Sequence, residues 1–346
     1  MSPKKKLPDG RGAVRRPTMG DIAALAGLHP SSVSLALRDS PAISVETRAR
    51  IRQIAQEIGY LRDPALDVFN FRRTSGHPMR SAPVLAFVSD EASWETFSSA
   101  RARCELLEGI VAASQRVGFV LERFLVGPGR LSGPRLRQIL RTRNTDSVVV
   151  GPLSMQTTVL PLDWERLGAV RIESFHLEPA LDIFSSNYRQ AALLAVEELY
   201  KLGYRRIGLA LGAEADSRLA GLLHIGFLTG NASVGIVPPI PACFGEAQEV
   251  ARWVERYDVE VVLGLDAGLA GRFTRHSGVV AFASLDLAGA PEGTAGVRHA
   301  HSEVGARVVE SIAVRRYIYQ RGVPGSPTRT FVPVRWEAGH SAPARL

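Results

Sequence analysis

The sequence predicts a small all-helical head followed by a larger α/β body. Residues 18–60 contain three short apolar-periodic runs separated by turn residues, a pattern typical of three helices. From residue 84 onward, short apolar runs alternate with amphipathic ones, which is typical of strands separated by helices. A length of 346 residues also exceeds what one ordinary core holds, so two or three domains are expected.

The first helix of the head is predicted to begin after Thr18, because Thr18 and Asp21 have the spacing of a capping box. Gly27 is expected to end it. The inner face of this helix is expected to consist of Ile22, Leu25 and Ala26.

The second helix is predicted to begin at Pro30, since proline suits the first helical position. Its inner face is expected to consist of Val33, Ala36 and Leu37. Ser44 is placed to cap a third helix, which Gly59 ends. The apolar residues of this third helix recur at helical spacing and are Ile51, Ile54, Ala55 and Ile58.

The net charge of +8 is concentrated near the N-terminus. Residues 1–81 contain 14 Lys and Arg against 7 Asp and Glu, whereas the remaining residues contain 28 against 27. A positive charge on a segment with a helical pattern favours a polyanionic partner for the head. The alternative is that the basic face is simply solvated. Residues 1–16 are expected to be a disordered basic tail that adds salt-dependent affinity.

Four stretches of the head carry a resemblance to a known family. They are DIAALAGL at 21–28, SVSLAL at 32–37, SVETRARI at 44–51 and EIGY at 57–60. In this order and at these spacings, the segment resembles the helix-turn-helix DNA-binding domain of the lactose-repressor (LacI/GalR) family of bacterial transcription regulators. The resemblance implies a DNA-binding domain over 17–62.

By this resemblance, the helix that begins near Pro30 enters the major groove. The head residues expected to contact DNA are Thr18, His29, Pro30, Ser31, Ser34, Leu35, Arg38, Ser44, Thr47 and Arg48. Leu35 departs from the family, which usually has an arginine there, and leucine offers only an apolar contact such as one to a thymine methyl. The operator is therefore expected to differ at that position. For Ser44, Thr47 and Arg48, simple capping and solvation remain the alternative.

Residues 63–81 are expected to form a hinge helix and linker, as in the resembled family. Counting from Tyr60 places Phe69 where the family inserts a leucine into the minor groove. Phenylalanine is also a side chain that can wedge between base steps. The alternative is that Phe69 packs against the body, and Asp67 is unfavourable on a DNA-facing helix.

The body is predicted to contain parallel sheets covered by helices on both faces. Strands are expected over 84–88, 119–125, 147–150, 169–172, 206–210, 260–263 and 278–282. Helices are expected over segments that include 106–117, 131–142, 191–202 and 245–257. Sheets of this kind bind ligands beyond the carboxyl ends of their strands.

The body also resembles the effector-binding domain of that family, through the stretches NYRQAA at 187–192 and LYKLGYRRIGLA at 199–210. The fold implied is periplasmic-binding-protein-like, with two Rossmann-like subdomains and three chain crossings over 82–340. Subdomain one is expected at about 82–184 and 298–326, and subdomain two at about 185–297 and 327–340. The positions of Arg218 and Asp266 match an effector-contacting arginine and aspartate of the family.

A charged pair such as Arg218 and Asp266 suits a polyhydroxylated or acidic small molecule, although a surface ion pair is the alternative. Trp94, Phe97 and Phe175 follow candidate strands and could stack on a sugar, or could belong to the core. The loop after the first strand, SDEASWE, departs from the family pattern and puts a typical sugar in doubt. Effector identity therefore stays open.

The sequence contains no motif that indicates catalysis. No dinucleotide, Walker or nucleophile-elbow motif follows a strand, so no cofactor and no catalytic residue is expected. His299 and His301 lack matched acidic partners and are interpreted as ordinary histidines rather than metal ligands. Cys104 and Cys243 have no metal-ligand spacing and are expected to be buried and reduced.

The sequence thus predicts a ligand-responsive transcription regulator, a repressor that binds a pseudo-palindromic operator as a homodimer. The alternatives are a sugar- or nucleotide-handling enzyme fused to a DNA-binding head, and a ligand-independent architectural DNA binder. Without a secretory signal or an apolar run long enough to cross a membrane, the chain is expected in the cytoplasm, associated with the nucleoid. Inducer or corepressor logic and any oligomer beyond the dimer stay open.

Overall fold

The computed structural model describes residues 17–37, 43–60, 82–90, 100–212, 215–265, 274–275 and 278–345. The chain divides into two compact units, Met1–Pro78 and Met79–Leu346. We refer to the described part of the first unit as the head and to the second unit as the body. The predicted basic tail, residues 1–16, lies outside the described residues.

The head consists of three helices, α1 (Met19–Ala26), α2 (Pro30–Leu37) and α3 (Val45–Glu57). The predicted capping box is confirmed: the Thr18 hydroxyl accepts from the Asp21 amide at 3.4 Å, and the Thr18 amide donates to the Asp21 carboxylate at 2.7 Å. Gly27 follows α1 with a φ of 64°, a left-handed conformation that favours glycine.

The core of the head lies where the three helices meet. It consists of Ile22, Ala23, Ala26, Val33, Ala36, Ile51 and Ala55. Leu37, Ile54 and Ile58 pack against it as predicted. The prediction for Leu25 was wrong, because its side chain is 59% exposed and Ala23 lies inside instead. The short side chains of α1 allow its neighbours to approach closely.

The body contains two six-stranded sheets in its described residues. The first has the order β13-β5-β4-β3-β1-β2, and all its neighbouring strands are parallel. Its strands are β1 (Val84–Asp90), β2 (Val120–Val126), β3 (Ser147–Val150), β4 (Gly168–Ile172), β5 (Ile183–Ser186) and β13 (Arg329–Val332). The helices on it are α6 (Ala100–Val117), α7 (Gly133–Thr142) and α12 (His301–Tyr317). We call this sheet and these helices the first lobe.

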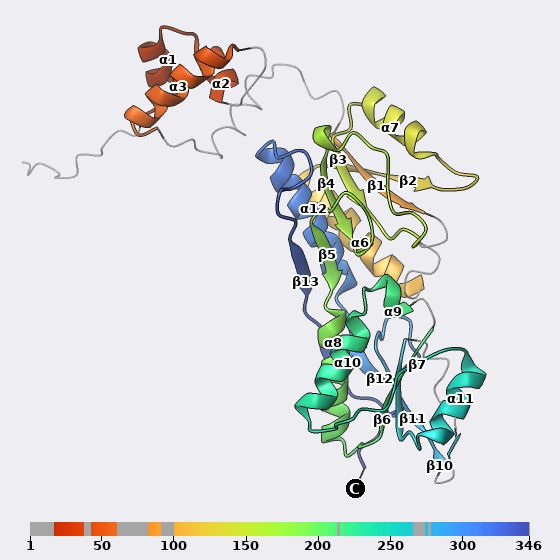
Figure 1. Ribbon diagram of the computed structural model, residues 1–346. Helices are drawn as coiled ribbons and strands as arrows, with labels where there is room; N and C mark the ends of the chain where they lie inside the picture. The colour runs from red at the N-terminus through yellow and green to blue at the C-terminus, as the bar shows by residue number, and fades with distance from the viewer. Residues whose placement is uncertain are drawn as a thin grey trace, which may run out of the picture. The chain divides into compact units, whose positions relative to one another are not determined.

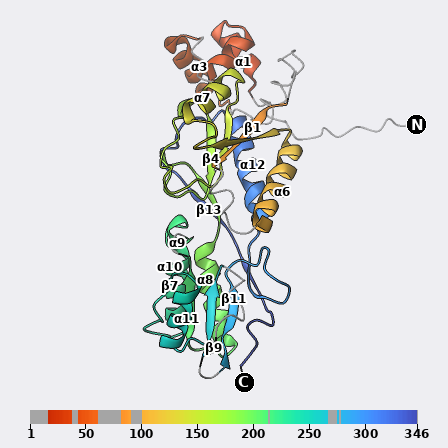
Figure 2. The same ribbon diagram turned by 90° about the vertical axis from the view of Figure 1, so that its right-hand side faces the viewer.

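Alternate residues of β1 show how the first sheet is covered on both faces. Leu85 and Phe87 pack against α6 and α12, which lie side by side (Figure 2). Ala86 and Val88 face the opposite way, toward α7 and its flanking loops. Because successive strand side chains point to opposite faces, a strand buried on both faces is apolar throughout. This explains the short apolar runs in the sequence.

The second sheet has the order β14-β12-β11-β8-β6-β7, parallel except for β14 against β12. Its strands are β6 (Ile207–Leu211), β7 (Cys243–Phe244), β8 (Val261–Gly264), β11 (Ala281–Ser284), β12 (Ala295–Arg298) and β14 (Arg335–Glu337). Its helices are α8 (Tyr188–Lys201), α10 (Leu222–Ser233) and α11 (Ala247–Arg256). We call these elements the second lobe (Figure 1). The predicted fold class, a helical head with an α/β body of two such lobes, is confirmed.

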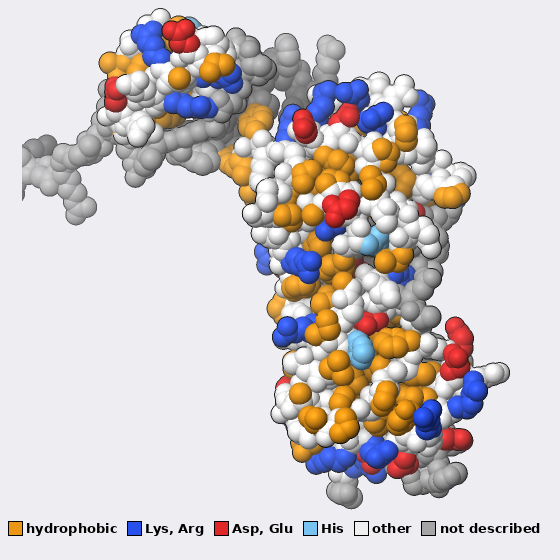
Figure 3. Space-filling model, viewed as in Figure 1, with side chains coloured by type: hydrophobic (Ala, Val, Ile, Leu, Met, Phe, Trp, Pro, Cys, Tyr) orange, Lys and Arg blue, Asp and Glu red, His pale blue; other side chains and the backbone are white. Residues whose placement is uncertain are grey.

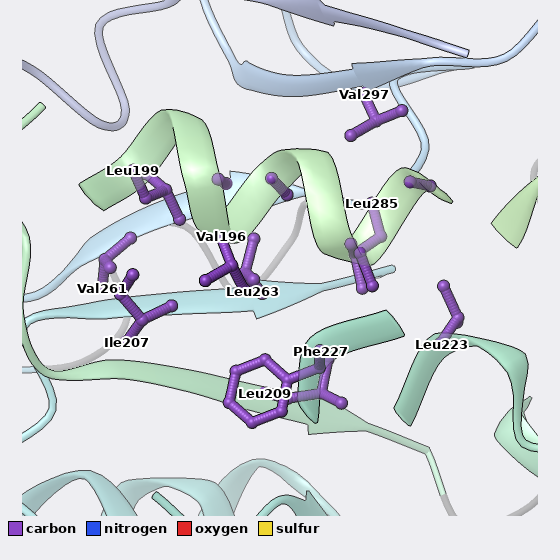
Figure 4. Close-up of a cluster of buried hydrophobic side chains, with 14 of the residues drawn as sticks. Val196, Leu199, Ile207, Leu209, Leu223, Phe227, Val261, Leu263, Leu285 and Val297 are labelled. Atoms are coloured by element: carbon purple, nitrogen blue, oxygen red, sulfur yellow. The ribbon is translucent and has the colours of Figure 1, made fainter. Parts of the chain in front are cut away.

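The core of the second lobe is built from apolar side chains of β6 and β8 under α8 and α10. In Figure 4, Leu209 of β6 and Phe227 of α10 lie against each other, and Leu263 lies beneath Val196 of α8. On the other face of the sheet, Trp253 of α11 packs with its neighbours in a second cluster. Each lobe therefore has its own core.

The chain passes between the lobes three times, after β5, after β12 and after β13. The last passage lies later than the boundary expected near 326, because β13 pairs with β5 and so belongs to the first lobe. The strand expected over 278–282 is also wrong in part. Gly278–Val279 is β10, which pairs with β9 (Thr274–Arg275) in a separate hairpin, and β11 begins at Ala281.

The two cysteines do not both lie in the core. The two cysteines are free, but Cys104 is exposed and Cys243 is half-buried, so the expectation that both are buried was wrong. Cys104 lies on an outward position of α6, and Cys243 lies on the edge strand β7.

In the part of the chain that the structure describes, no helix combines the length and apolarity needed to cross a membrane.

The contact between α6 and α12 depends on glycine. A Cβ added to Gly109 would lie 1.9 Å from the Ser302 carbonyl oxygen, which is backbone and cannot rotate away. We expect Gly109→Ala to lower the free energy of unfolding of the body by about 2 kcal/mol or more, as overpacking does. Urea unfolding followed by tryptophan fluorescence measures this, since all four tryptophans lie beyond residue 81. Gly325→Ala, where a Cβ meets nothing within 4 Å, is the control, and an equal effect of the two changes would contradict the account.

Candidate DNA-binding surface and lobe junction

The start of α2 presents a polar, exposed surface on the head. His29, Pro30 and Ser31 are exposed, while Val33 and Ala36 on the opposite side of the helix are buried. The imidazole Nδ1 of His29 lies 2.8 Å from the Ser31 hydroxyl and accepts from the Ser31 amide at 3.3 Å. His29 thus caps the helix and is held in place at its N-terminus. An exposed helix N-terminus of this kind is suited to a base edge or a phosphate.

One helical turn further, Leu35 is 40% exposed and Ser34 is half-buried. Part of the Leu35 side chain is therefore accessible from solvent. The structure therefore places both residues on the surface expected to face bases, as the sequence suggested, and their contact with DNA stays a prediction.

The residues considered for phosphate contacts have local roles in the fold. Ser44 accepts from the Thr47 amide at 3.2 Å, and its hydroxyl donates to the Thr47 hydroxyl at 2.8 Å. Ser44 thus caps α3, and Arg48 one turn later is half-buried. Thr18 caps α1 and is exposed. Because Thr18 and Ser44 are exposed, the N-termini of α1 and α3 are also accessible to a phosphate group. Arg38 and Phe69 lie outside the described residues.

In the body, the carboxyl ends of the strands of both sheets meet at one junction between the lobes (Figure 1). The described residues place Arg218 there: it is the last residue of the short helix α9 (Ala215–Arg218), is half-buried, and its positive charge acts on Glu173 in the other lobe. Phe175 is half-buried beyond β4, with the Arg329 guanidinium carbon 5.7 Å from its ring centroid. Trp94, Phe97 and Asp266 lie outside the described residues.

The junction is held together by a buried carboxyl and a buried phenol from different lobes. Tyr188, the first residue of α8, donates its hydroxyl to Glu173 Oε1 at 2.9 Å. Glu173 follows β4 and, like Ser174 after it, has a positive φ, at 54° and 46°. Two consecutive non-glycine residues in this region are costly, and such outliers concentrate at binding sites. The Ser174 hydroxyl stabilises the turn by donating to the Gly151 carbonyl at 3.0 Å.

A second pair of side chains, one from each lobe, also joins the lobes. His301 opens α12 in the first lobe, and its Nε2 lies 3.0 Å from Asp286 Oδ2 beyond β11 of the second lobe. His299 Nε2 lies 2.7 Å from the Leu285 carbonyl oxygen. The two imidazoles stack with centroids 5.4 Å apart, and the Tyr188 ring lies 5.0 Å from His299. Both histidines are 2% exposed. We call Glu173, Tyr188, His299, His301 and Asp286 the junction cluster.

Burial shifts the ionisation of the junction cluster. Loss of solvation raises the pKa of Glu173 to about 7, although the Tyr188 hydrogen bond and the charges of His301 and Arg218 oppose the rise. Burial also lowers the pKa of His299. For His301, burial is outweighed by the hydrogen bond and charge of Asp286, so its pKa is raised. Near neutral pH, the cluster therefore contains a carboxyl and an imidazole that change charge easily.

The shift of Glu173 predicts that its contribution to the stability of the body falls as pH rises from 5 to 8, whereas the lowered pKa of His299 acts in the opposite direction. In the unfolded chain Glu173 ionises near 4.5, but in the folded chain near 7, so over that interval the folded state binds more protons at Glu173 and this contribution falls. The difference corresponds to about 3 kcal/mol. The raised pKa of His301 acts in the same direction, since its contribution is complete below the ordinary value and is lost as pH rises through the folded one.

Glu173→Gln tests this, because the amide oxygen can still accept from Tyr188 but cannot ionise. Urea unfolding at several pH values should show the variant gaining stability relative to the parent as pH rises. Glu255→Gln on the exposed face of α11 is the control and should run parallel to the parent. If Glu173→Gln also runs parallel, the raised pKa is wrong.

The sequence did not single out the junction cluster as a unit. From the sequence, His299 and His301 are interpreted as ordinary histidines rather than metal ligands. Among the residues with described positions, no group of three or more His, Cys, Asp and Glu side chains could hold a metal ion. The available signal was two histidines beside a strand end at a chain crossing, with Asp286 15 residues earlier. The contact between Asp286 and His301 itself could not be predicted, because it depends on the passage of the chain between the lobes after β12.

Comparisons with known proteins agree with this description. Residues 18–63 match the family described as "Bacterial regulatory proteins, lacI family", which confirms the resemblance stated for the head. The HTH-type transcriptional regulator reg1 of Streptomyces lividans is 29% identical over 200 residues, 56% of this chain and 53% of that protein. The HTH-type transcriptional repressor MelR of Bacillus subtilis is 28% identical over 206 residues, 58% of this chain and 55% of that protein. The chain spans about half the length of the relatives that it matches.

Solved structures match over nearly the whole chain. The transcriptional regulator CelR, solved as a cellobiose complex, has a TM-score of 0.57 and 19% identity over 94% of this chain and 100% of that one. The lac repressor dimer bound to operator and the anti-inducer ONPF has a TM-score of 0.50 and 15% identity over 95% and 100%. At these identities the likeness shows the fold, a helix-turn-helix head with a two-lobed α/β body.

Proposed function

We propose, on the premise that residues 18–63 form a lacI-family DNA-binding head, that this chain is a bacterial transcription regulator that represses by binding a specific operator. The observation that carries the proposal is the start of α2, where exposed polar side chains stand over a buried Val33 and Ala36. A homodimer on a pseudo-palindromic operator follows from the way such heads are used, since one head reads only a half-site. Such a protein acts in the cytoplasm, associated with the nucleoid.

Within the head we assign base contacts to the exposed surface of α2 and phosphate contacts to the helix N-termini. The proposed contacts are Thr18, His29, Pro30, Ser31, Ser34, Leu35, Arg38, Ser44, Thr47 and Arg48. We assign a hinge to residues 63–81, with Phe69 inserted into the minor groove. The net positive charge of residues 1–81 supports this assignment, because it adds affinity for any duplex.

The body is proposed to bind a small effector, a sugar or a sugar derivative, between the lobes. Arg218 supports this, because it is half-buried at the junction and its donors suit hydroxyl or carboxylate oxygens. We assign contacts to Arg218 and Phe175, together with Asp266, Trp94 and Phe97. CelR, a structural neighbour, was solved with cellobiose, which is consistent with a carbohydrate in a body of this fold.

The proposed mechanism is a population shift. Binding between the lobes favours one angle between them, and a ligand can change operator affinity only by as much as it prefers one arrangement over the other. The three crossings and the junction cluster link the lobes, so any change in their angle must be accommodated there. No catalytic step is proposed: the charged groups at the junction are hydrogen-bonded into the fold rather than presented as an acid, a base or a nucleophile.

The test is selection of genomic fragments by the purified full chain, with and without a panel of neutral and acidic sugars. We expect enrichment of one inverted-repeat sequence, and its loss or gain with one class of sugar. Enrichment of bent or AT-rich fragments without a shared sequence would support an architectural protein instead. Consumption of a sugar during the assay would support an enzyme.

A further inference from the structure

A hollow lies in the first lobe, at the end of the sheet away from the lobe junction. Its lining residues come from the end of α7, the loop into β3, the loop into β4 and the segment after α12. They are Arg137, Leu140, Arg141, Asn144, Thr145, Asp146, Leu162, Asp163, Arg166, Leu167 and Arg321. The hollow is open to solvent, and the space free of protein atoms within it, open solvent included, is about 390 Å³.

The position of the hollow follows from the topology. Asp146 directly precedes β3 and Leu167 directly precedes β4, so the lining gathers at the amino ends of these strands. The loops are held together by the Gly168 amide, which donates to the Asp146 carbonyl at 2.7 Å, and by the Gly322 amide, which donates to the Leu167 carbonyl at 3.0 Å. Of the proposed effector residues, Arg218 and Phe175 have described positions, and they follow the carboxyl ends of β6 and β4. The two sites are therefore separate.

The charge of the lining is strongly positive. Four arginines line the hollow against two aspartates. Both aspartates are already engaged: Arg141 Nε lies 2.6 Å from Asp163 Oδ2, and Arg321 Nη2 lies 2.7 Å from Asp146 Oδ2. A further arginine outside the lining, Arg316, pairs with the other oxygen of Asp146.

Two of the four lining arginines have no such neighbour. Among the described residues, no carboxylate pairs with Arg137 or Arg166, and both side chains are exposed. Figure 3 shows Lys and Arg side chains gathered, with acidic ones between them, at the end of the body where α7 lies. Two guanidinium groups without a carboxylate partner, beside two paired ones, favour an anion over a cation or a neutral sugar.

A buried hydroxyl adds a second, independent observation. Thr145 is 7% exposed and lines the hollow, and its Oγ1 has no hydrogen-bond partner among the described residues. A buried hydroxyl without a partner is costly, and in most proteins it is satisfied by protein, water or ligand. Thr145 therefore adds an unsatisfied polar group to the wall of the hollow.

We infer that this hollow binds the phosphate group of a small phosphorylated metabolite, at a site separate from the proposed effector site. Guanidinium groups bind phosphate oxygens in pairs of parallel hydrogen bonds, which a chloride ion cannot reproduce. The remaining part of such a ligand would lie over Leu140, Leu162 and the aliphatic stems of the arginines. The chain would then respond to two small molecules.

The test is titration calorimetry on the full chain with inorganic phosphate and with glucose 6-phosphate. Glucose and sodium chloride at matched ionic strength are the parallel arms. We expect saturable binding of one phosphate group per chain, absent with glucose and chloride. In the double variant Arg137→Ala, Arg166→Ala, we expect the dissociation constant to rise about tenfold or more. Arg135→Ala is the matched control, an exposed arginine on the same helix that hydrogen-bonds to Gln138 and does not line the hollow.

Three results would overturn the inference. Binding that chloride reproduces, or that does not saturate, would show only a diffuse positive surface. An equal loss in Arg135→Ala would show that general charge, not the hollow, is responsible. If the double variant weakens operator binding but leaves phosphate binding unchanged, these arginines meet the DNA backbone instead. Because both substituted side chains are exposed, circular dichroism should show the variants folded.

Discussion

Replacing Arg218 by alanine is expected to weaken or abolish the response of operator binding to the small molecule and to leave operator affinity in its absence unchanged. The guanidinium of Arg218 is half-buried at the lobe junction, close enough to Glu173 for its charge to lower the pKa of that carboxyl. Loss of charge-assisted hydrogen bonds to a ligand costs about 1.5–3 kcal/mol each, so the effector would bind at least about tenfold more weakly.

The measurement is fluorescence anisotropy of labelled operator across a ligand titration, for the parent and for Arg218→Ala. Arg252→Ala, on the exposed face of α11 in the same lobe, is the matched control and should respond as the parent does. A normal response in Arg218→Ala would remove this residue from the ligand site. Weakened operator binding without ligand would mean that the substitution disturbs the fold.

Replacing Leu35 by arginine is expected to change the preferred base at one position of each half-site. Leu35 is 40% exposed on the surface of α2 that carries His29 and Ser31. A leucine can offer only apolar contact, whereas an arginine can bind guanine through two hydrogen bonds, a difference worth about 1–3 kcal/mol of discrimination. The preference at that position should move toward G·C, by roughly five- to 150-fold.

Selection from randomised duplexes measures this change of preference. Leu25→Arg is a useful control, because Leu25 is also an exposed leucine of the head but lies on α1. It should raise affinity for all duplexes without changing the sequence selected. An unchanged profile for Leu35→Arg would exclude Leu35 from base recognition.

The head was largely predictable from sequence because its determinants are local. Caps at Thr18 and Ser44, the turn at Gly27 and the apolar spacing of α3 each operate within a few residues. The misplacement of Leu25 has a tertiary cause. On a helix of only eight residues, two apolar faces are nearly equivalent, and packing against α2 and α3 selects the one with Ala23.

In the body, the buried apolar strands were predictable but several partners of those strands were not. Two of these strands lack an apolar run. β5 has the sequence IFSS and β12 has the sequence AGVR, so each contains small or polar residues. They become strands because neighbours in the sheet supply their hydrogen bonds. β13 was assigned to the wrong lobe for the same reason, since its pairing with β5 cannot be read from its own residues.

The junction cluster shows where sequence reasoning reaches its limit. Glu173 and Tyr188 are 15 residues apart, as are Asp286 and His301, yet each pair spans two lobes because a chain crossing lies between its members. Arg218 could be proposed from a resemblance, but its relation to Glu173 required the fold. The same holds for the arginine-lined hollow, whose residues come from three separate stretches of the chain, 137–146, 162–167 and 321.

In the proposed mechanism, a ligand bound in the body changes the affinity of the head for DNA. This mechanism is tested most directly by measuring the dissociation constant of the selected operator with and without a saturating amount of the sugar that altered the selection. We predict a change of about fivefold or more, equal to at least about 1 kcal/mol of coupling, and the same factor when sugar affinity is measured with and without operator. Equal operator affinities in the presence and absence of bound sugar would contradict the account.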